Sequence, residues 1–239
     1  MTNRIKQFAI IAAGEGSRLA QEGVEKPKPL VCLNGEPMIN RLVRIFIANG
    51  AERIAIIVNQ LNEQTALHMK QLMAQTSACS IELVVKSTPS SMHSFYELAT
   101  KLDDAPFCLT TVDTVFKEED FRAYLDSFSK SDADGMMAVT DFIDDEKPLY
   151  VEVDEQMKIR NFCDERSDCR FVSGGIYGLT PRALATLKRC IAEGQHRMRN
   201  FQRGLIADGL ELKAYRFSKI LDVDHATDIQ KAEHFLQSE

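Results

Sequence analysis

The stretch AAGEGSRL at residues 12–19 comes directly after the apolar run FAII at residues 8–11. An apolar run that ends in a glycine-rich turn is typical of a buried strand in an α/β protein, and the backbone N–H groups of such a turn can bind phosphate oxygens. Arg18 adds a forked hydrogen-bond donor for the same kind of anion. We therefore expect a phosphorylated ligand at this turn.

Two standard phosphate-binding motifs do not match the turn. The dinucleotide fingerprint requires a third glycine where Leu19 stands, and an acidic residue at the end of the second strand, where the sequence reads VNQ at 58–60. The Walker A motif requires Lys-Ser or Lys-Thr after a longer spacing, whereas Ser17 and Arg18 follow the second glycine at once.

A basic, proline-containing stretch, EKPKPLV at residues 25–31, follows the turn. The prolines restrict the backbone beside Lys26 and Lys28 and so help to hold the two ammonium groups in place. The glycine turn, Arg18 and these lysines together predict a phosphate-binding site.

Short apolar runs alternate with longer segments whose apolar residues recur at helical spacing. Strands are predicted at 7–13, 53–58, 81–85, 107–112 and 134–140, and helices at 37–50, 62–75, 90–102 and 117–130. This alternation predicts parallel βαβ units in a Rossmann-like α/β fold, with helices covering both faces of the sheet.

The pattern changes after residue 140. A hairpin is predicted at 148–163, further strands at 170–179, 210–217 and 220–223, and helices at 181–194, 198–209 and 225–236. Because no linker or low-complexity tract divides the chain, we expect a single domain over 1–239 whose second half adds a small antiparallel substrate lobe.

Composition excludes several classes of protein. The net charge of −6 argues against a general nucleic-acid or membrane surface, and the first apolar run is too short to span a membrane. Without a secretory cleavage pattern, we expect a cytoplasmic protein with free cysteines. Cys163 and Cys169 could form a metal pair, but no second pair accompanies them.

The opening of the chain resembles the nucleotidyltransferases that make activated sugars and related head groups, a family that includes NDP-sugar pyrophosphorylases and phosphocholine nucleotidyltransferases. The motifs that carry the resemblance are GEGSR at 14–18, PKPL at 27–30 and GEPMI at 35–39. Later landmarks follow in order, so the resemblance covers nearly the whole chain and is strongest at residues 8–43. It implies a nucleotide-binding half at about 1–140 and an acceptor-binding half at about 141–239.

The resemblance implies that an NTP and a phosphorylated small molecule react on the enzyme with Mg²⁺ as the cofactor. Arg18 and Lys28 are expected to be catalytic, and the nucleotide-binding residues of the glycine turn are expected to be Ala13, Gly14, Gly16 and Ser17. No protein nucleophile is needed, because a phosphate oxygen of the acceptor attacks directly; the protein has to align the groups and neutralise charge.

Two carboxylates are expected to hold the metal. Asp113 follows the fourth strand, although Val112 stands where the family usually has glycine. In the closing segment ILDVDHATD at 220–228 we favour Asp222 as the second ligand. We expect the Asp224 side chain to point to the other side, where it could cap the last helix.

The remaining site residues are expected in two loops. Ser90, Ser91 and Ser94 could bind the base or ribose, or a serine could merely cap the helix that begins there. His93 lies among them, but the chemistry requires no general base. On the acceptor side, the resemblance implies Gly174 and Gly175 of VSGGIYGL (172–179), with Ser173 in place of the usual asparagine, and Glu165. Three nearby arginines are expected to form a solvated helix face or, alternatively, a phosphate or subunit contact: Arg197, Arg199 and Arg203.

We expect a sugar 1-phosphate as the acceptor. The alternatives are a CTP-dependent enzyme of the phosphocholine type and a non-catalytic nucleotide-sensing subunit on the same fold. A quaternary ammonium usually binds in an aromatic cage, and the aromatic candidates are Phe142, Tyr150, Phe162 and Tyr177. A homo-oligomer is possible, and no nucleic-acid or membrane partner is expected.

Overall fold

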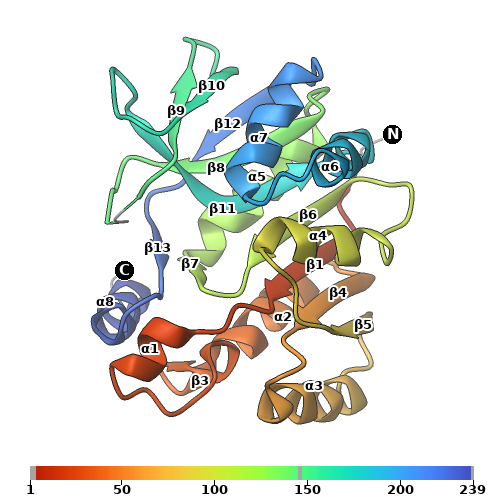
Figure 1. Ribbon diagram of the computed structural model, residues 1–239, viewed down its shortest axis with the longest axis vertical. Coiled ribbons are helices and arrows are strands. Elements are labelled where there is room, and N and C mark those ends of the chain that lie inside the picture. The colour runs from red at the N-terminus through yellow and green to blue at the C-terminus, as the bar shows by residue number, and fades with distance from the viewer. Residues whose placement is uncertain (1–3, 145–146, 238–239) are drawn as a thin grey trace.

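The computed structural model describes residues 4–144 and 147–237, and a nine-stranded sheet forms its centre (Figure 1). The strands of this sheet are β1 (Gln7–Ala12), β4 (Arg53–Val58), β5 (Ser80–Val85), β6 (Phe107–Thr111), β8 (Gly135–Thr140), β9 (Tyr150–Val153), β10 (Ile159–Cys163), β11 (Phe171–Leu179) and β12 (Leu212–Arg216). Each of them lies within two residues of a range predicted from the apolar pattern.

The first half of the chain supplies a parallel run of strands in the order β5-β4-β1-β6. Phe8 of β1 lies opposite Ile54 of β4 on one side and Cys108 of β6 on the other. The predicted parallel βαβ arrangement is confirmed for these strands, and parallel neighbours bring their carboxyl ends to one edge of the sheet.

The fifth predicted strand, β8, does not pair with any of these four strands. Instead, β11 runs antiparallel to both β6 and β8, while β12 joins β8 in parallel. The β9–β10 hairpin attaches through β9 to the first residues of β11. The simple parallel series is thus wrong at this point, because the pairing partners of β8 come from much later in the chain.

Helices cover both faces of the sheet, as predicted. They are α2 (Met38–Ala48), α3 (Glu63–Gln75), α4 (Ser91–Ala99), α5 (Glu118–Ser129), α6 (Ala183–Ala192) and α7 (Met198–Ala207); the last helix, α8 (Ala226–Gln237), instead packs against the short strands β2 (Cys32–Leu33) and β13 (Ile220–Asp222). Alternate residues of β1 face the two layers: Phe8 and Ile10 belong to the core that contains α2 and α5, whereas Ala9 and Ile11 belong to the core that contains α4, α6 and α7.

Several short elements were not predicted, because periodicity is not recognisable over so few residues. They are α1 (Ser17–Gln21), the 3-10 helix η1 (Lys28–Leu30), β2 (Cys32–Leu33), β3 (Glu36–Pro37) and β7 (Thr114–Phe116). The predicted strand β13 (Ile220–Asp222) pairs antiparallel with β7, which brings Asp222 opposite Thr114. These short elements surround the carboxyl edge of the parallel strands.

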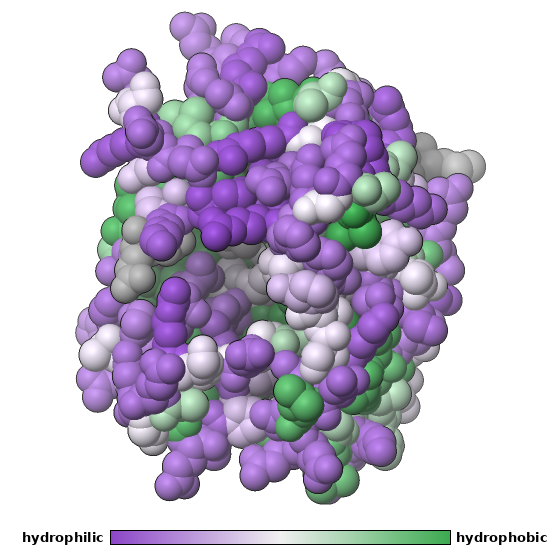
Figure 2. Space-filling view, in the orientation of Figure 1, coloured by the Kyte–Doolittle hydropathy of each residue, from purple (hydrophilic) through white to green (hydrophobic). Residues whose placement is uncertain are grey.

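The last helix returns to the beginning of the chain. In Figure 1, α8 lies beside α1, and the backbone N–H of Asn34 donates to Glu233 of α8 at 2.9 Å. Figure 2 shows that this face is hollowed at its centre, with hydrophilic residues around much of the hollow. None of the helices within the described ranges combines the length and apolarity that crossing a membrane would require.

Candidate active site

A chain of ion pairs joins residues from both ends of the sequence. The Lys28 Nζ atom lies 2.5 Å from Asp113 Oδ2 and 2.6 Å from Asp224 Oδ1. Arg18 Nη1 lies 3.1 Å from the other oxygen of Asp224. The structure therefore brings Arg18, Lys28 and Asp113 together, although Lys28 and Asp113 are 85 residues apart in sequence.

Burial and charge act in opposite directions on this cluster. Burial by itself raises the pKa of Asp113, but the Lys28 ammonium and its hydrogen bond outweigh that effect and hold the pKa below its ordinary value. Burial by itself lowers the pKa of Lys28, and the carboxylates of Asp113 and Asp224 more than compensate, so that the Lys28 pKa is raised. Both directions keep the groups ionised at neutral pH.

The glycine turn allows η1 to approach closely. Gly16 has a φ of 63°, in the left-handed region that favours glycine, and precedes the first residue of α1. A Cβ atom at Gly16 would lie 3.0 Å from the Cβ atom of Lys28. The absence of a side chain at Gly16 thus helps to position Lys28, which is a packing role beside the predicted one in phosphate binding.

A pocket of about 320 Å³, which we call the serine pocket, extends from Lys28 and Asp113 to the start of α4. Of the predicted nucleotide-binding residues, five line it: Ala13, Gly14, Ser90, Ser91 and Ser94. Gly16 lines an adjoining pocket together with Lys26 and Lys28. Ser17 is exposed at the first position of α1.

The serines at α4 also have structural roles. Ser90 is the N-cap of α4 and accepts a hydrogen bond from the backbone N–H of His93. The alternative prediction, that a serine caps this helix, is therefore confirmed for Ser90. Ser94 is buried, and its hydroxyl lies 2.6 Å from that of Thr88. The His93 ring stacks on His196 with centroids 5.3 Å apart, and burial, followed by the His196 charge, lowers the pKa of His93.

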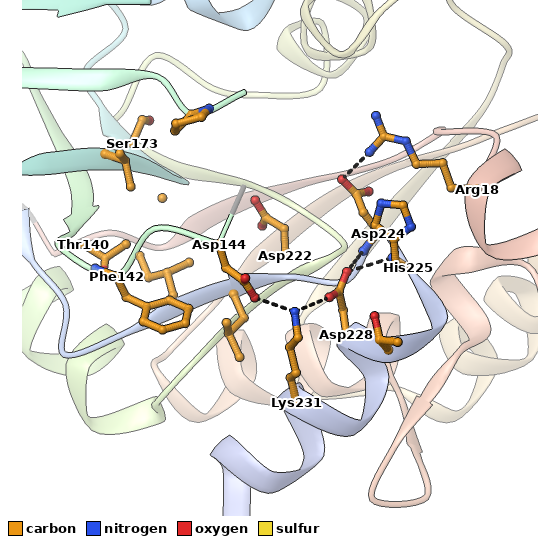
Figure 3. Close-up of a pocket in the computed structure, with 16 residues that line it drawn as sticks. Arg18, Thr140, Phe142, Asp144, Ser173, Asp222, Asp224, His225, Asp228 and Lys231 are labelled. Carbon is orange, nitrogen blue, oxygen red and sulfur yellow. Dashed lines mark hydrogen bonds and ion pairs between the residues drawn. The ribbon is translucent and has the colours of Figure 1, made fainter. Parts of the chain in front are cut away.

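A second pocket of about 230 Å³ is lined by Arg18 and Asp224 of the ion-pair chain (Figure 3). We call it the aspartate pocket because Asp144, Asp222, Asp224 and Asp228 all line it. The expectation that Asp222 and Asp224 point to opposite sides was wrong, since residues two apart on an extended strand face the same way.

Asp224 does not cap the last helix either. Its carboxylate is held by Lys28 and Arg18, whereas Asp228 accepts hydrogen bonds from the backbone N–H groups of Asp224 and His225. Asp228 and Asp144 both pair with Lys231 (Figure 3). A motif of alternating aspartates could not show which carboxylate receives the distant Lys28.

Gly174 and Gly175 permit close packing beneath the aspartate pocket. A Cβ atom at Gly174 would lie 2.2 Å from Ile220 Cδ1, and one at Gly175 would lie 3.0 Å from Thr114 Oγ1. Gly174 and Ser173 line the pocket, and Ser173 Oγ accepts a hydrogen bond from Gln202 at 3.3 Å. Contact of these glycines with an acceptor stays a prediction.

Glu165 lies outside the aspartate pocket, in a shallow pocket with Arg199 and Tyr150. Arg199 and Arg203 both pair with Asp164, which gives the basic segment of α7 a structural role. Of the four candidate cage aromatics, Phe142 lines the aspartate pocket, Tyr150 lines the shallow pocket, and Phe162 and Tyr177 are buried.

The donor atoms at the junction of the two pockets suit a hard cation. The Thr114 hydroxyl donates to Asp222 Oδ1 at 3.3 Å, and the Val223 N–H donates to the Asp113 carbonyl at 3.1 Å, so the two aspartates lie on adjoining segments. Within residues 4–144 and 147–237, no three His, Cys, Asp or Glu side chains converge on a metal-sized site. Mg²⁺ needs only one or two carboxylates when phosphates and water complete its shell, so Asp113 and Asp222 fit that ion.

Sequence reasoning missed Asn59, although its position directly after β4 was a signal. Asn59 lines the serine pocket, where the dinucleotide fingerprint would have an acidic residue, and the residue is only 8% exposed. Pro29 and Leu61 also line this pocket and were not predicted.

Comparison with known proteins identifies a matching family and a shared fold. Residues 8–205 match the model of the MobA-like NTP transferase domain. The 2-aminoethylphosphonate cytidylyltransferase of Lancefieldella rimae is 31% identical over 119 residues, which cover 49% of this chain and 47% of that protein. The mannose-1-phosphate guanyltransferase of Aspergillus fumigatus is 27% identical over 187 residues, which cover 75% of this chain and 50% of that protein. This chain thus spans about half the length of the curated relatives it matches.

Solved structures with the same fold cover nearly the whole chain. The inositol-1-phosphate CTP transferase from T. maritima has a TM-score of 0.80 at 16% identity, with 100% of both chains covered. A putative glucose-1-phosphate thymidylyltransferase from Bacillus anthracis has a TM-score of 0.84 at 18% identity, with 98% of this chain and 96% of that chain covered. At these identities the likeness shows the fold alone.

Proposed function

This chain belongs to the MobA-like NTP transferase family, and on that premise we propose that it transfers a nucleotidyl group from an NTP to a phosphorylated small molecule. The observation that carries the proposal is the position of the ion-pair chain between two pockets. Lys28 and Asp113 line the serine pocket, whereas Arg18 and Asp224 line the aspartate pocket. A nucleotide in the first pocket and an acceptor in the second would meet at these charges.

In the proposed reaction, an oxygen of the acceptor phosphate attacks the α-phosphorus of the NTP. A bond forms between that oxygen and the α-phosphorus. The bond from the α-phosphorus to the oxygen that bridges the α- and β-phosphates breaks, and pyrophosphate leaves with the electrons of that bond. Lys28 and Arg18 would exchange their carboxylate partners for phosphate oxygens and stabilise the negative charge of the transition state. The closely packed glycine turn would keep Lys28 in place during that exchange.

Asp113 and Asp222 are the residues that would hold Mg²⁺. When bound, the ion neutralises phosphate charge and helps to align the attacking and leaving oxygens. Asp113 would then be relieved of its pairing with Lys28, which becomes available to phosphate.

A sugar 1-phosphate is the first candidate acceptor, and the match to a mannose-1-phosphate guanyltransferase over 75% of the chain supports it. The second candidate acceptor is a zwitterionic phosphate or phosphonate, such as phosphocholine, with CTP as the nucleotide. It is favoured by the carboxylates of the aspartate pocket and by Phe142, whose ring already accepts a cation–π contact from Lys219 at 3.9 Å. A match to a 2-aminoethylphosphonate cytidylyltransferase supports the same candidate.

The test is pyrophosphate release from CTP, UTP, GTP and dTTP, each combined with sugar 1-phosphates, phosphocholine and 2-aminoethylphosphonate. We expect turnover with one NTP and one acceptor class, and loss of turnover when EDTA removes Mg²⁺. The matched inactive variant is Asp113→Asn, which should retain the fold while its turnover falls by at least about 100-fold. Folded native protein that releases no pyrophosphate with any pair would contradict the proposal.

A further inference from the structure

Asn59 connects three separate segments through one buried side chain. Its Nδ2 atom donates to the carbonyl of Ala13 at 3.1 Å. Its Oδ1 atom accepts hydrogen bonds from the backbone N–H of Leu61 at 2.9 Å and from the Ser87 hydroxyl at 2.7 Å. The donor and the acceptor of the side-chain amide are therefore both used.

The three partners follow three neighbouring parallel strands, and all of them line the serine pocket. Ala13 follows β1, Leu61 follows β4, and Ser87 follows β5. The backbone ladder between β1 and β4 ends with the pair Ala12 and Val58. Beyond that pair the segments must diverge to form a pocket, and the Asn59 side chain supplies the cross-links that the backbone no longer provides.

Leu61 shows what this arrangement presents to a ligand. The residue is 78% exposed, and it lines both the serine pocket and the adjoining pocket of Lys26 and Lys28. Its backbone is fixed by Asn59, so the apolar side chain is held at the entrance rather than packed in the core. An apolar side chain at the entrance of the serine pocket would be covered by the flat face of a nucleoside's base or by its ribose.

We propose that Asn59 is a positioning residue that holds the serine pocket open for the NTP and presents Leu61 to the nucleoside. This inference rests on the proposed function, since it assigns the serine pocket to the nucleotide. Preorganisation lowers the ordering that binding must impose, so it acts on nucleotide affinity. The chemical groups of the reaction, Lys28 and Asp113, have no hydrogen bond with Asn59 among the described contacts, so the chemical step is spared.

The experiment compares Asn59→Ala with Asn49→Ala. Asn49 makes a side-chain bond of the same kind, from Nδ2 to the Ile45 carbonyl at 2.8 Å, but it ends α2 away from the pocket. Calorimetry uses Mg²⁺ with whichever of CTP, UTP, GTP or dTTP binds the native protein most tightly. We expect Asn59→Ala to weaken binding about tenfold or more, with the KM for the NTP rising in step, kcat within about threefold and the acceptor KM unchanged. Asn49→Ala should leave NTP binding unchanged.

Two further pairs of variants keep the test decisive if Asn59→Ala fails to fold. Ser87→Ala removes one cross-link to Asn59, and Asn59→Asp removes the donor to the Ala13 carbonyl; each should weaken NTP binding relative to the native protein, and unchanged NTP affinity in both would overturn the inference. Where Asn59→Ala does fold, adding Ser87→Ala to it should have no further effect on NTP binding. Leu61→Ser should weaken NTP binding about threefold or more at constant kcat, whereas Leu67→Ser, at a position 59% exposed on α3, should not.

Unchanged NTP affinity in folded Asn59→Ala, or an equal loss in Asn49→Ala, would overturn the inference. A fall in kcat without a change in NTP affinity would also overturn it. Binding and turnover separate this inference from the proposed function: a native protein that binds an NTP but releases no pyrophosphate refutes the reaction, while the affinities of the variants still decide the role of Asn59. A native protein that binds none of the four NTPs refutes both.

Discussion

Lys28 is held by two carboxylates that lie 85 and 196 residues away in sequence, and its own side chain is only 11% exposed. A buried ion pair of this kind is costly to break from one side, because the remaining charges lose their partner. The cluster therefore links the charge state of the site to the stability of the whole protein.

Lys28→Met should lower the unfolding free energy of the protein by an amount that depends on pH. Without the ammonium, Asp113 remains half-buried beside Asp224, and its partial burial raises its pKa rather than lowering it. At pH 7 we expect the free energy of unfolding to fall by about 1–3 kcal/mol and turnover to fall by at least about 100-fold. Urea unfolding and pyrophosphate release measure the two effects.

The sign of the pH dependence follows from the lowered Asp113 pKa in the native protein. That carboxylate stabilises the fold at pH values above the ordinary unfolded value of about 3.9, and the contribution is lost as the pH falls through the lower folded value. The raised Lys28 pKa contributes below about pH 10.4 and is lost at higher pH. The deficit of Lys28→Met should therefore begin to shrink as the pH falls through the raised Asp113 pKa of the variant, above the ordinary value of about 3.9, and should go on shrinking down to the lowered pKa of the native protein. An equal deficit at pH 7 and pH 3.5 would contradict the assignment.

Asp222 and Asp224 should respond differently to neutralisation. We expect Asp222→Asn to lower turnover at least about 100-fold and to raise the Mg²⁺ concentration needed for half-maximal rate, because a metal ligand is lost. Asp224→Asn should cost about tenfold without a shift in Mg²⁺ dependence, because it alters only the alignment of Lys28 and Arg18. Titration of the rate with Mg²⁺ distinguishes them, and the opposite order would make Asp224 the ligand.

At the scale of elements, β11 determines how closely the two halves of the site approach. Its glycines let β7 and β13 lie directly against it; Asp113 directly precedes β7, and Asp222 is the last residue of β13. A side chain on this strand would push those segments away.

Gly174→Ala should destabilise the protein through one identifiable contact. The new Cβ would lie 2.2 Å from Ile220 Cδ1, a clash that we expect to cost about 1–3 kcal/mol in unfolding free energy. Ile220→Val removes that Cδ1 atom, and by itself should cost about 0.5–1.5 kcal/mol. The double variant should lose less unfolding free energy than the sum of the two single variants, because the clashing atom is gone. A double-mutant cycle in denaturant unfolding measures this difference. If the two losses simply add, the Cδ1 atom of Ile220 is not the source of the Gly174→Ala cost.

At the scale of the whole molecule, the site joins the beginning, the middle and the end of the chain. Lys28 comes from η1, Asp113 from the end of β6, and Asp224 from the approach to α8. Glu22, just after α1, accepts hydrogen bonds from His225 and Ala226 and so fastens the start of α8. A ligand that bridges the two pockets would therefore bind only the folded chain.

Nucleotide binding should accordingly stabilise the entire fold. With Mg²⁺ and an NTP at about 100 times its dissociation constant, linkage predicts a gain of about 2.7 kcal/mol in unfolding free energy. We expect a higher melting temperature in thermal unfolding with Mg²⁺ and NTP together, a smaller rise when EDTA is added, and a smaller rise for Lys28→Met. An equal rise in melting temperature with and without Mg²⁺ would contradict the placement of the metal at the nucleotide site.

Much of the fold was predictable because its signals are local. The run FAII, the helix that ends before Gly50, and the β9–β10 hairpin each follow from the spacing of a few apolar and turn residues. The position of β11 between β6 and β8 was not predictable in this way, because strand pairing between distant segments depends on packing of the complete sheet. The short strand β7 and helix α1 were missed because they contain too few residues for a period.

The amino-acid sequence by itself determined the class of fold and the glycine turn before Arg18, because these depend on residue types at short spacing, and its resemblance to a known family supplied the candidates Lys28, Asp113 and Asp222. Only the tertiary structure decided that Asp224 pairs with Lys28, that Asp228 accepts hydrogen bonds from the backbone N–H groups of Asp224 and His225, and that Glu165 lies in another pocket. It alone showed that Asn59 joins three loops. These outcomes depend on which distant side chains share a buried space, and local spacing carries no record of that.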